Sequence, residues 1–218
     1  MGKYSIQHMV NFMVSSNYDV KGVKEMAILV TGGAGYIGSH TCVELLEQGY
    51  EVVIVDNLSN SNQKVINRLE DITKKRVISY FIDLLHKEAI EQIFKVHDIE
   101  AVIHFAGYKA VGESVEKPLK YYENNLLSTI NLCRVMEANN VHNLIFSSSA
   151  TVYGTPEMFP IQEDFPTSAL NPYGRTKLMI EEILQDLSVA NANWNIALLR
   201  YFNPVGAHET GLLGESPN

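Results

Sequence analysis

The glycine-rich segment Thr31-Gly32-Gly33-Ala34-Gly35-Tyr36-Ile37-Gly38 constrains the fold of this 218-residue chain more than any other feature. It directly follows a short apolar run, 26–30, and opens an amphipathic stretch, 36–48, so it joins an expected buried strand to an expected helix. Glycines here permit a tight turn, leave room for a phosphate beside Gly35 and let the helix approach the strand. The start of such a helix offers free amides and a partial positive charge to an anion.

Short apolar runs alternate with longer amphipathic runs along the rest of the chain. The expected strands are 26–30, 51–55, 76–81, 101–105, 143–147 and 196–201, and the expected helices are 36–48, 63–73, 87–96, 115–138 and 171–190. Strands separated by helices pair in parallel through right-handed crossovers. An all-apolar strand such as Val52-Val53-Ile54-Val55 belongs in a sheet covered on both faces. The pattern predicts an α/β fold, a doubly wound parallel sheet of the Rossmann type.

Composition narrows the range of partners and compartments. The formal net charge of −8 argues against nucleic acid or an anionic membrane as the main partner. Two cysteines, Cys42 and Cys133, lie in expected helices and are interpreted as buried free thiols in a reducing compartment. We find no apolar run of 18 residues and no secretory signal pattern, so we expect a cytoplasmic protein.

An aspartate ends the second expected strand. Asp56 lies 18 positions after Gly38, which suits a carboxylate that accepts hydrogen bonds from the adenosine ribose hydroxyls. That carboxylate would repel a 2′-phosphate, and Asn57-Leu58-Ser59 supplies no arginine to neutralise one, so the segment favours NAD over NADP. The alternative interpretation is an ordinary turn with a helix-capping aspartate. Asp83, after the third strand, either borders adenine or caps the next helix.

The segment Asn171-Pro172-Tyr173-Gly174-Arg175-Thr176-Lys177 opens the last long expected helix. Asn171 suits the N-cap and Pro172 the first helical position. Tyr173 and Lys177 then lie four residues apart on one helix face. A lysine ammonium and the positive end of the helix dipole both favour a phenolate, so Tyr173 is predicted to act as a base near neutral pH. Taken alone, Y-x-x-x-K more often marks a surface tyrosine with a solvated lysine.

Serines end the fifth expected strand. The segment Phe146-Ser147-Ser148-Ser149-Ala150-Thr151 lies at the carboxyl end of a strand, where ligands bind in parallel sheets. A serine hydroxyl there could bond a hydroxyl or carbonyl group of a substrate. For Ser147 and Ser148, hydrogen bonds to the backbone of their own turn are a competing interpretation. The irregular stretch 154–170 that follows has the length of a lid or another functional loop.

The first 25 residues do not share the periodicity of the rest of the chain. The ordered pattern begins abruptly at Met26. We expect residues 1–25 to be either a translated leader ahead of a start at Met26 or a disordered extension. Neither interpretation changes the expected function.

Five longer strings resemble nucleotide-sugar epimerases of the extended short-chain dehydrogenase/reductase family. They are TGGAGYIGSHT at 31–41, VIHFAGYKAVGES at 102–114, FSSSATVYG at 146–154, NPYGRTK at 171–177 and ALLRYFNPVGAH at 197–208. The resemblance covers nearly all of 26–218, and together the strings are highly specific. One departure is Tyr108, where leucine is more usual in the family.

The resemblance implies a role for each matching position. Tyr173, Lys177 and Ser149 are expected to be catalytic, and the substrate-binding set is expected to be Lys109, Ser149, Tyr173 and Asn203. The implied NAD-binding residues are Gly32, Gly35, Tyr36, Ile37, Gly38, Asp56, Asn57, Leu58, Ser59, Asn60, Ser61, Asp83, Leu84, Phe105, Ala106, Gly107, Lys109, Asn124, Ser147, Tyr173, Lys177, Tyr201 and Phe202. No metal is expected.

The activity implied by the resemblance is NAD-dependent interconversion of UDP-glucose and UDP-galactose, with a homodimer as the family expectation. Residues 26–201 would form the NAD-binding domain, and 202–218 would begin a small substrate domain that is mostly missing. Alternatives are an epimerase of UDP-N-acetylhexosamines and a catalytically dead NAD-binding module. A dehydratase ranks low, because Ser149-Ala150-Thr151-Val152 lacks the acidic pair that eliminates water.

Overall fold

A single parallel sheet organises the protein. The computed structural model describes residues 27–215, so the interpretations of residues 1–25 and of a start at Met26 lie outside the described residues. The sheet has six strands in the order β3-β2-β1-β4-β5-β6, the dinucleotide-binding order that a doubly wound fold predicts. The strands are β1 (Ala27–Thr31), β2 (Glu51–Val55), β3 (Ile78–Tyr80), β4 (Ile99–His104), β5 (Asn143–Ser149) and β6 (Asn195–Tyr201).

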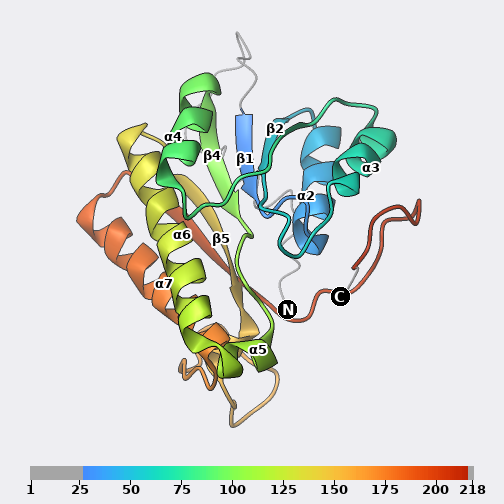
Figure 1. Cartoon of the computed structure of the whole chain (residues 1–218). Helices are drawn as coiled ribbons and strands as arrows, with labels where there is room; N and C mark the ends of the chain where they lie inside the picture. Colours follow the sequence, from blue (N-terminus) through green and yellow to red (C-terminus); the bar gives the residue numbers. More distant parts are fainter. Residues whose placement is uncertain (1–26, 216–218) are drawn as a thin grey trace.

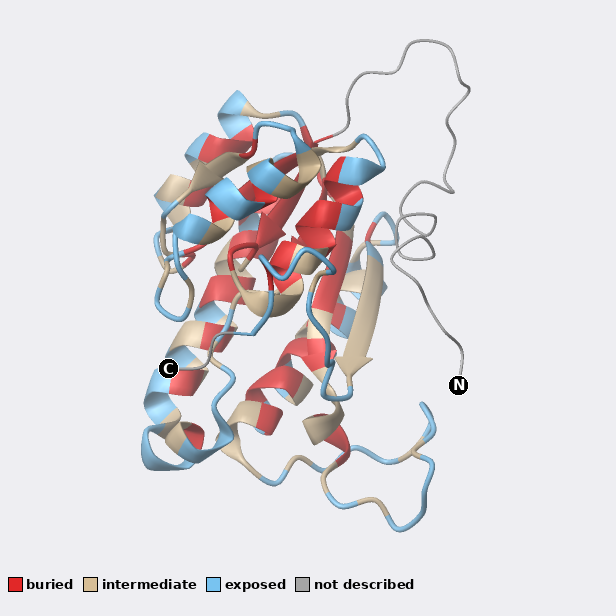
Figure 2. Ribbon diagram, turned by 90° about the vertical axis from the view of Figure 1, so that its right-hand side faces the viewer, coloured by how far each residue is buried: buried red, intermediate tan, exposed pale blue. Residues whose placement is uncertain are grey.

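Helices cover both faces of the sheet (Figure 1). On one face lie α2 (Tyr36–Glu47) and α3 (Lys64–Thr73), and on the other lie α4 (Lys87–Val96), α6 (Pro118–Ala138) and α7 (Pro172–Ala190). Alternation along β1 and β2 explains the two cores. Ile28 and Ile54 point towards α2 and α3, whereas Leu29 and Val53 point towards α4, α6 and α7. Figure 2 shows this buried interior as a continuous band between exposed helix faces.

One expected helix is two helices in the structure. Instead of a single helix over 115–138, the chain forms α5 (Val111–Glu116) and then α6, with Lys117 between them at φ −130° and ψ 60°. The reason is Pro118, which disfavours a helical conformation for the residue before it and itself suits the first position of a new helix. The expected single helix was therefore wrong at its start, and the proline is the signal that shows it.

The carboxyl ends of the strands carry the irregular parts of the chain. After β5 comes a short 3-10 helix, η1 (Ala150–Tyr153), which the sequence pattern did not predict. The segment between η1 and α7 has neither helix nor strand, as expected for 154–170, and Figure 1 shows it at the same end of the sheet as α5. Residues 202–215 likewise form no helix or strand. Within 27–215, no helix is both long and apolar enough to span a membrane.

Candidate active site

The glycine turn between β1 and α2 is shaped by close backbone contacts. Gly32 has φ +70°, and a Cβ on it would lie 2.7 Å from the backbone nitrogen of Ala106, in the turn after β4. A Cβ on Gly38 would overlap the carbonyl oxygen of Gly32. At Gly35 the nearest atom to a Cβ would be that same oxygen, at 3.1 Å, so this position opens outward. Gly35 is the N-cap of α2 and has no side chain to cap it, which leaves the first amides of the helix to a ligand.

Asp56 lies beside this turn and is 8% exposed. Its carboxylate accepts hydrogen bonds from the amides of Ala34 (3.0 Å) and Leu58 (2.9 Å) and from the hydroxyl of Ser61 (2.8 Å). The helix-capping interpretation is wrong, because Gln63 is the N-cap of α3. The carboxylate instead ties the turn after β1 to the turn after β2, at the edge where the predicted ribose site lies.

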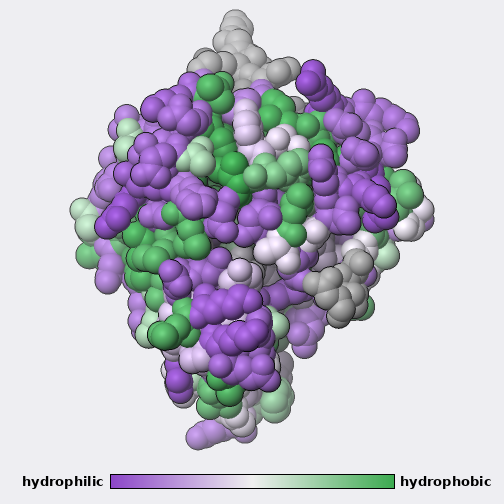
Figure 3. Space-filling model, viewed as in Figure 1, coloured by the Kyte–Doolittle hydropathy of each residue, from purple (hydrophilic) through white to green (hydrophobic). Residues whose placement is uncertain are grey.

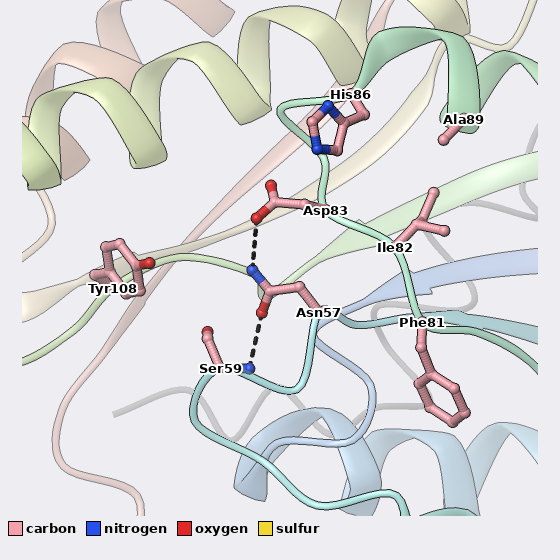
Figure 4. Close-up of a pocket in the computed structure, with 8 residues that line it drawn as sticks. All are labelled: Asn57, Ser59, Phe81, Ile82, Asp83, His86, Ala89 and Tyr108. Atoms are coloured by element: carbon pink, nitrogen blue, oxygen red, sulfur yellow. Dashed lines mark hydrogen bonds between the residues drawn. The ribbon is translucent and has the colours of Figure 1, made fainter.

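A cleft of about 640 Å³ opens at Asn57, the residue that follows Asp56 (Figure 4). Asn57 spans one wall: its amide nitrogen donates to Asp83 (2.9 Å) and its amide oxygen accepts from the backbone of Ser59 (3.0 Å). Tyr108 faces this pair across the cleft. The residues that line it are Asn57, Ser59, Phe81, Ile82, Asp83, His86, Ala89 and Tyr108.

The capping alternative for Asp83 is also wrong. Asp83 accepts a hydrogen bond from the backbone of Leu85 (2.9 Å), but the N-cap of α4 is His86. Asp83 therefore orders the turn ahead of α4, and its other oxygen faces the cleft through Asn57. Leu84, its neighbour, is buried in the core.

The start of α7 lies beside the end of β5, and side chains of the two elements contact each other there. Asn171 caps α7 as predicted, because its side-chain oxygen accepts from the amide of Gly174 at 2.8 Å. A side-chain hydrogen bond joins Tyr173 to Ser149. Lys177 is 5% exposed, and its Nζ donates to the carbonyl oxygen of Ser147 at 2.7 Å. This burial contradicts the interpretation of Y-x-x-x-K as a surface tyrosine with a solvated lysine.

Burial dominates the electrostatics of this cluster. It raises the pKa of Tyr173, and the hydrogen bond with Ser149 opposes that rise. Burial lowers the pKa of Lys177 to about 8, against the attraction of the Glu181 carboxylate. The expectation that Lys177 itself lowers the pKa of Tyr173 is therefore not met in this structure: the lysine points to the Ser147 carbonyl, and Ser149 is the group that favours the phenolate.

The serines at the end of β5 have different partners. Ser148 does not bond its own turn, because its hydroxyl donates to Glu181 in α7. Ser147 presents its carbonyl oxygen to Lys177. Ser149 is the residue that bonds its own turn: its hydroxyl oxygen accepts from the amide and the hydroxyl of Thr151, at 3.2 and 3.0 Å. The competing interpretation thus fails for Ser148 and describes Ser149, which also faces Tyr173.

The remaining predicted residues lie around the same edge of the sheet. Phe105 and Tyr201 pack with ring centroids 6.4 Å apart, and burial raises the pKa of Tyr201 to about 12. Lys109 forms an exposed ion pair with Glu215 at 3.1 Å. The exposed or half-buried positions are Tyr36, Ile37, Asn60, Ala106, Gly107, Asn124, Phe202 and Asn203.

Two buried residues that hold this edge together were not predicted. Asn125 in α6 accepts from the amide of Tyr108 (2.8 Å) and donates to its carbonyl (3.1 Å) and to Thr176 in α7 (3.0 Å). His104 is fully buried between the hydroxyls of Thr31 (2.6 Å) and Thr129 (3.0 Å). The sequence signals that could have pointed to these two buried residues are an asparagine inside an amphipathic helix and a histidine at the end of an apolar strand.

The fold and this site together define a class of proteins. Residues 28–215 match the NAD dependent epimerase/dehydratase family, and the chain belongs to that family. The family depends on NAD, which confirms the predicted cofactor.

Within the family, the chain is similar to UDP-glucose 4-epimerases. The enzyme of Bacillus subtilis (strain 168) is 63% identical over 193 residues, and that of Dictyostelium discoideum is 58% identical over 190 residues. These alignments cover 88% and 87% of this chain but only 57% and 55% of those proteins. The crystal structure of UDP-glucose 4-epimerase from Bifidobacterium longum, in complex with NAD⁺ and UDP, superposes with a TM-score of 0.86 at 56% identity. It matches 88% of this chain and 58% of that chain.

Proposed function

We propose that this chain is the NAD-binding and catalytic part of an enzyme that interconverts UDP-glucose and UDP-galactose. The observation that carries the proposal is the placement of Tyr173 against Ser149 and of Lys177 against Ser147, at the carboxyl end of the same sheet whose first strand leads into the glycine turn. The similarity to UDP-glucose 4-epimerases supports the substrate class. The chain spans 57% of the length of the Bacillus subtilis relative, so we propose the activity for the enzyme of which this chain forms a part.

The residues present fit a bound dinucleotide. The outward opening at Gly35 and the uncapped start of α2 suit a pyrophosphate. Asp56 directly precedes Asn57, which lines the cleft with Ser59 and Asp83, in the position expected for the adenosine half. Ser147, Tyr173 and Lys177, with Phe105 and Tyr201 behind them, would hold the nicotinamide half. The other predicted cofactor positions would contact the same dinucleotide.

The chain supplies proton transfer and orientation. NAD, when bound, takes up a hydride from C4 of the hexose and gives one back. Tyr173 removes the proton of the 4-hydroxyl at its phenolic oxygen and later returns it, while Ser149 hydrogen-bonds the same sugar oxygen. Loss of that proton and of the C4 hydride leaves a 4-keto sugar. Reduction from its other face inverts C4. Lys177, held by the Ser147 carbonyl, would help to hold the nicotinamide ribose.

The chain would be organised in two parts. Residues 26–201 would be the NAD-binding domain and 202–218 the start of a substrate-binding region, with Lys109 and Asn203 on its side of the site. We also propose a homodimer and a cytoplasmic location, without a nucleic-acid or membrane partner. The acidic composition supports the last point.

The test is conversion of UDP-galactose to UDP-glucose by the purified 218-residue chain. Formation of UDP-glucose without added NAD supports both the activity and a retained cofactor. A parallel assay with UDP-N-acetylgalactosamine separates the proposed substrate from its acetamido analogue. If the 218-residue chain is inactive, the same assay is made on a chain extended by the remaining segment of a relative. If the extended chain forms no UDP-glucose either, the proposal is overturned.

A further inference from the structure

A buried carboxylate lies one turn beyond Lys177 on the same face of α7. Glu181 is 1% exposed, which is unusual for a charged side chain. Arg200 of β6 grips it through three short contacts: Nη2 to Oε2 at 2.7 Å, Nε to Oε1 at 3.0 Å and Nε to Oε2 at 3.3 Å. The hydroxyl of Ser148 in β5 donates to the same carboxylate. Side chains from two strands thus hold one residue of the catalytic helix.

Three successive residues of β5 contact three successive turns of α7. Ser149 bonds Tyr173, the carbonyl of Ser147 accepts from Lys177, and Ser148 bonds Glu181. A slip of α7 along β5 would leave the buried Glu181 carboxylate without the side chains that now bond it, which is costly for a charged group. The Glu181 anchor therefore sets the register that brings Tyr173 to Ser149.

Arg200 extends this anchor to the irregular segment 154–171. Its guanidinium lies 4.6 Å from the ring centre of Tyr153, and its Nη1 donates to the carbonyl oxygen of Glu163 at 3.3 Å. The hydroxyl of Tyr153 reaches the same carbonyl at 3.5 Å. The segment that leads into α7 is thus tied through Arg200 to the helix that carries Tyr173.

Stability alone does not account for this arrangement. Apolar side chains of similar volume usually replace a buried ion pair without loss of stability, because burying two charges is itself costly. The pair joins α7 to β5 through Glu181 and joins the segment 154–171 to both of them through Arg200. The negative charge of Glu181 also acts on Lys177, and the charge of Lys177 acts in turn on His104.

We propose that Glu181 and Arg200 are positioning residues that lock α7 onto β5 and hold the segment 154–171 over the site. The inference rests on the proposed function, because it assigns the pair to the placement of Tyr173 and Lys177 against NAD and the sugar. Its effect is geometric: without the anchor, the catalytic side chains lie in more than one position, and turnover falls more than substrate affinity.

The experiment compares Glu181→Gln with Glu182→Gln, a matched control one residue along, because Glu182 is exposed. Hydrogen exchange of the amides in 154–171 is measured first and needs no ligand. We expect exchange in Glu181→Gln to rise at least about tenfold over Glu182→Gln. NAD titration of both variants follows, with an expected rise in Kd of about tenfold for Glu181→Gln only.

Kinetics of the active chain, extended if required, supply the readout that a purely structural role would not move. We expect kcat for UDP-galactose to fall at least about tenfold in Glu181→Gln while KM changes less than about twofold. The double variant Glu181→Gln/Arg200→Met removes both charges, so it avoids an unpaired buried charge if the single variant fails to fold. It should be folded yet still show fast exchange in 154–171 and the low kcat.

The outcomes separate the two proposals. If the unmodified chain neither binds NAD nor turns over UDP-galactose when extended, the proposed function fails, and the exchange data still decide whether the anchor holds the segment. If the unmodified chain binds NAD while Glu181→Gln and the double variant match the Glu182→Gln control in exchange, Kd and kcat, the positioning role is overturned.

Discussion

At the scale of single residues, the site is defined by the hydrogen-bond partners of its buried polar side chains. Tyr173 is half-buried and bonded to Ser149, so its proton affinity depends on that one contact and on burial. Lys177 is buried beside the same strand and directs its ammonium to a carbonyl oxygen. His104, fully buried, bridges two threonine hydroxyls below the site. Each of these groups makes a separate and testable contribution.

Replacing Tyr173 by Phe removes the proposed base and leaves the ring in place. We expect kcat for UDP-galactose to fall by about 10²-fold or more, because general acid–base catalysis contributes on that scale. NAD affinity should stay within about threefold, since the glycine turn and Asp56 are untouched. The measurement is the coupled epimerase assay on the active chain together with NAD titration. Unchanged turnover would show that another group takes the proton.

His104 predicts a pH dependence of stability. Burial, with a smaller contribution from Lys177, lowers its pKa to about 3, below the ordinary value of about 6.5. The unfolded chain therefore binds the proton first, so stability is full above about pH 6.5 and falls as the pH drops below it, by about 1.4 kcal/mol per unit for this group.

The check is urea unfolding of the wild type and of His104→Gln at pH 7.5 and pH 5. We expect the wild type to lose about 2 kcal/mol more than the variant over this range, because only the wild type must keep an unprotonated imidazole buried. All other histidines are common to both proteins and cancel in the difference. Equal losses would mean that folding does not lower the pKa of His104.

At the scale of elements, the turns after β1 and β4 pack on each other without side chains between them. Gly32 lies against the backbone of Ala106, and Gly38 brings the first turn of α2 onto the Gly32 carbonyl. Asp56 then joins this unit to the turn after β2. The turns after β1, β2 and β4 are thus held together by close backbone contacts at Gly32 and by the Asp56 carboxylate, so the segment expected to bind phosphate is rigid.

Gly38→Ala tests this packing, with Gly112→Ala as its control. A methyl group at Gly38 would overlap the Gly32 carbonyl, whereas one at Gly112 in α5 meets nothing within 4 Å. We expect Gly38→Ala to lower the free energy of unfolding by about 1–3 kcal/mol and to weaken NAD binding. Gly112→Ala should change the free energy of unfolding by less than about 1 kcal/mol in the stabilising direction. Urea unfolding and NAD titration measure both. Equal effects would contradict the role given to Gly38.

At the scale of the whole molecule, two buried cores enclose one sheet, and apolar side chains remain on the outer helix faces. The exposed fractions are 80% for Leu119 and 46% for Leu127 in α6, and 40% for Met179 in α7. Figure 3 shows hydrophobic surface over this side of the molecule, at the left of the view. Cys42 and Cys133 are free and buried, as predicted, so within 27–215 no disulfide contributes to the stability of the fold.

The homodimer that we propose would use the outer faces of α6 and α7. We expect the protein to sediment as a dimer at micromolar concentration, and Leu119→Glu combined with Met179→Glu to sediment as a monomer, because a buried unpaired carboxylate is costly. Val189→Glu is the control, since Val189 is 87% exposed near the end of α7. Sedimentation velocity of the three proteins is the measurement. A monomeric wild type would remove the homodimer from the proposal.

The sequence by itself determined the order of strands and helices, the glycine turn, Asp56 and the Tyr173–Lys177 pair, because periodicity, glycine and caps are local properties of the chain. The tertiary structure alone decided which groups meet across the sheet. It paired Ser148 and Arg200 with Glu181, placed His104 between two threonines, and turned Lys177 to the Ser147 carbonyl rather than to Tyr173. Such contacts join residues distant in the sequence, and burial, which sets their proton affinities, exists only once the helices have packed on the sheet.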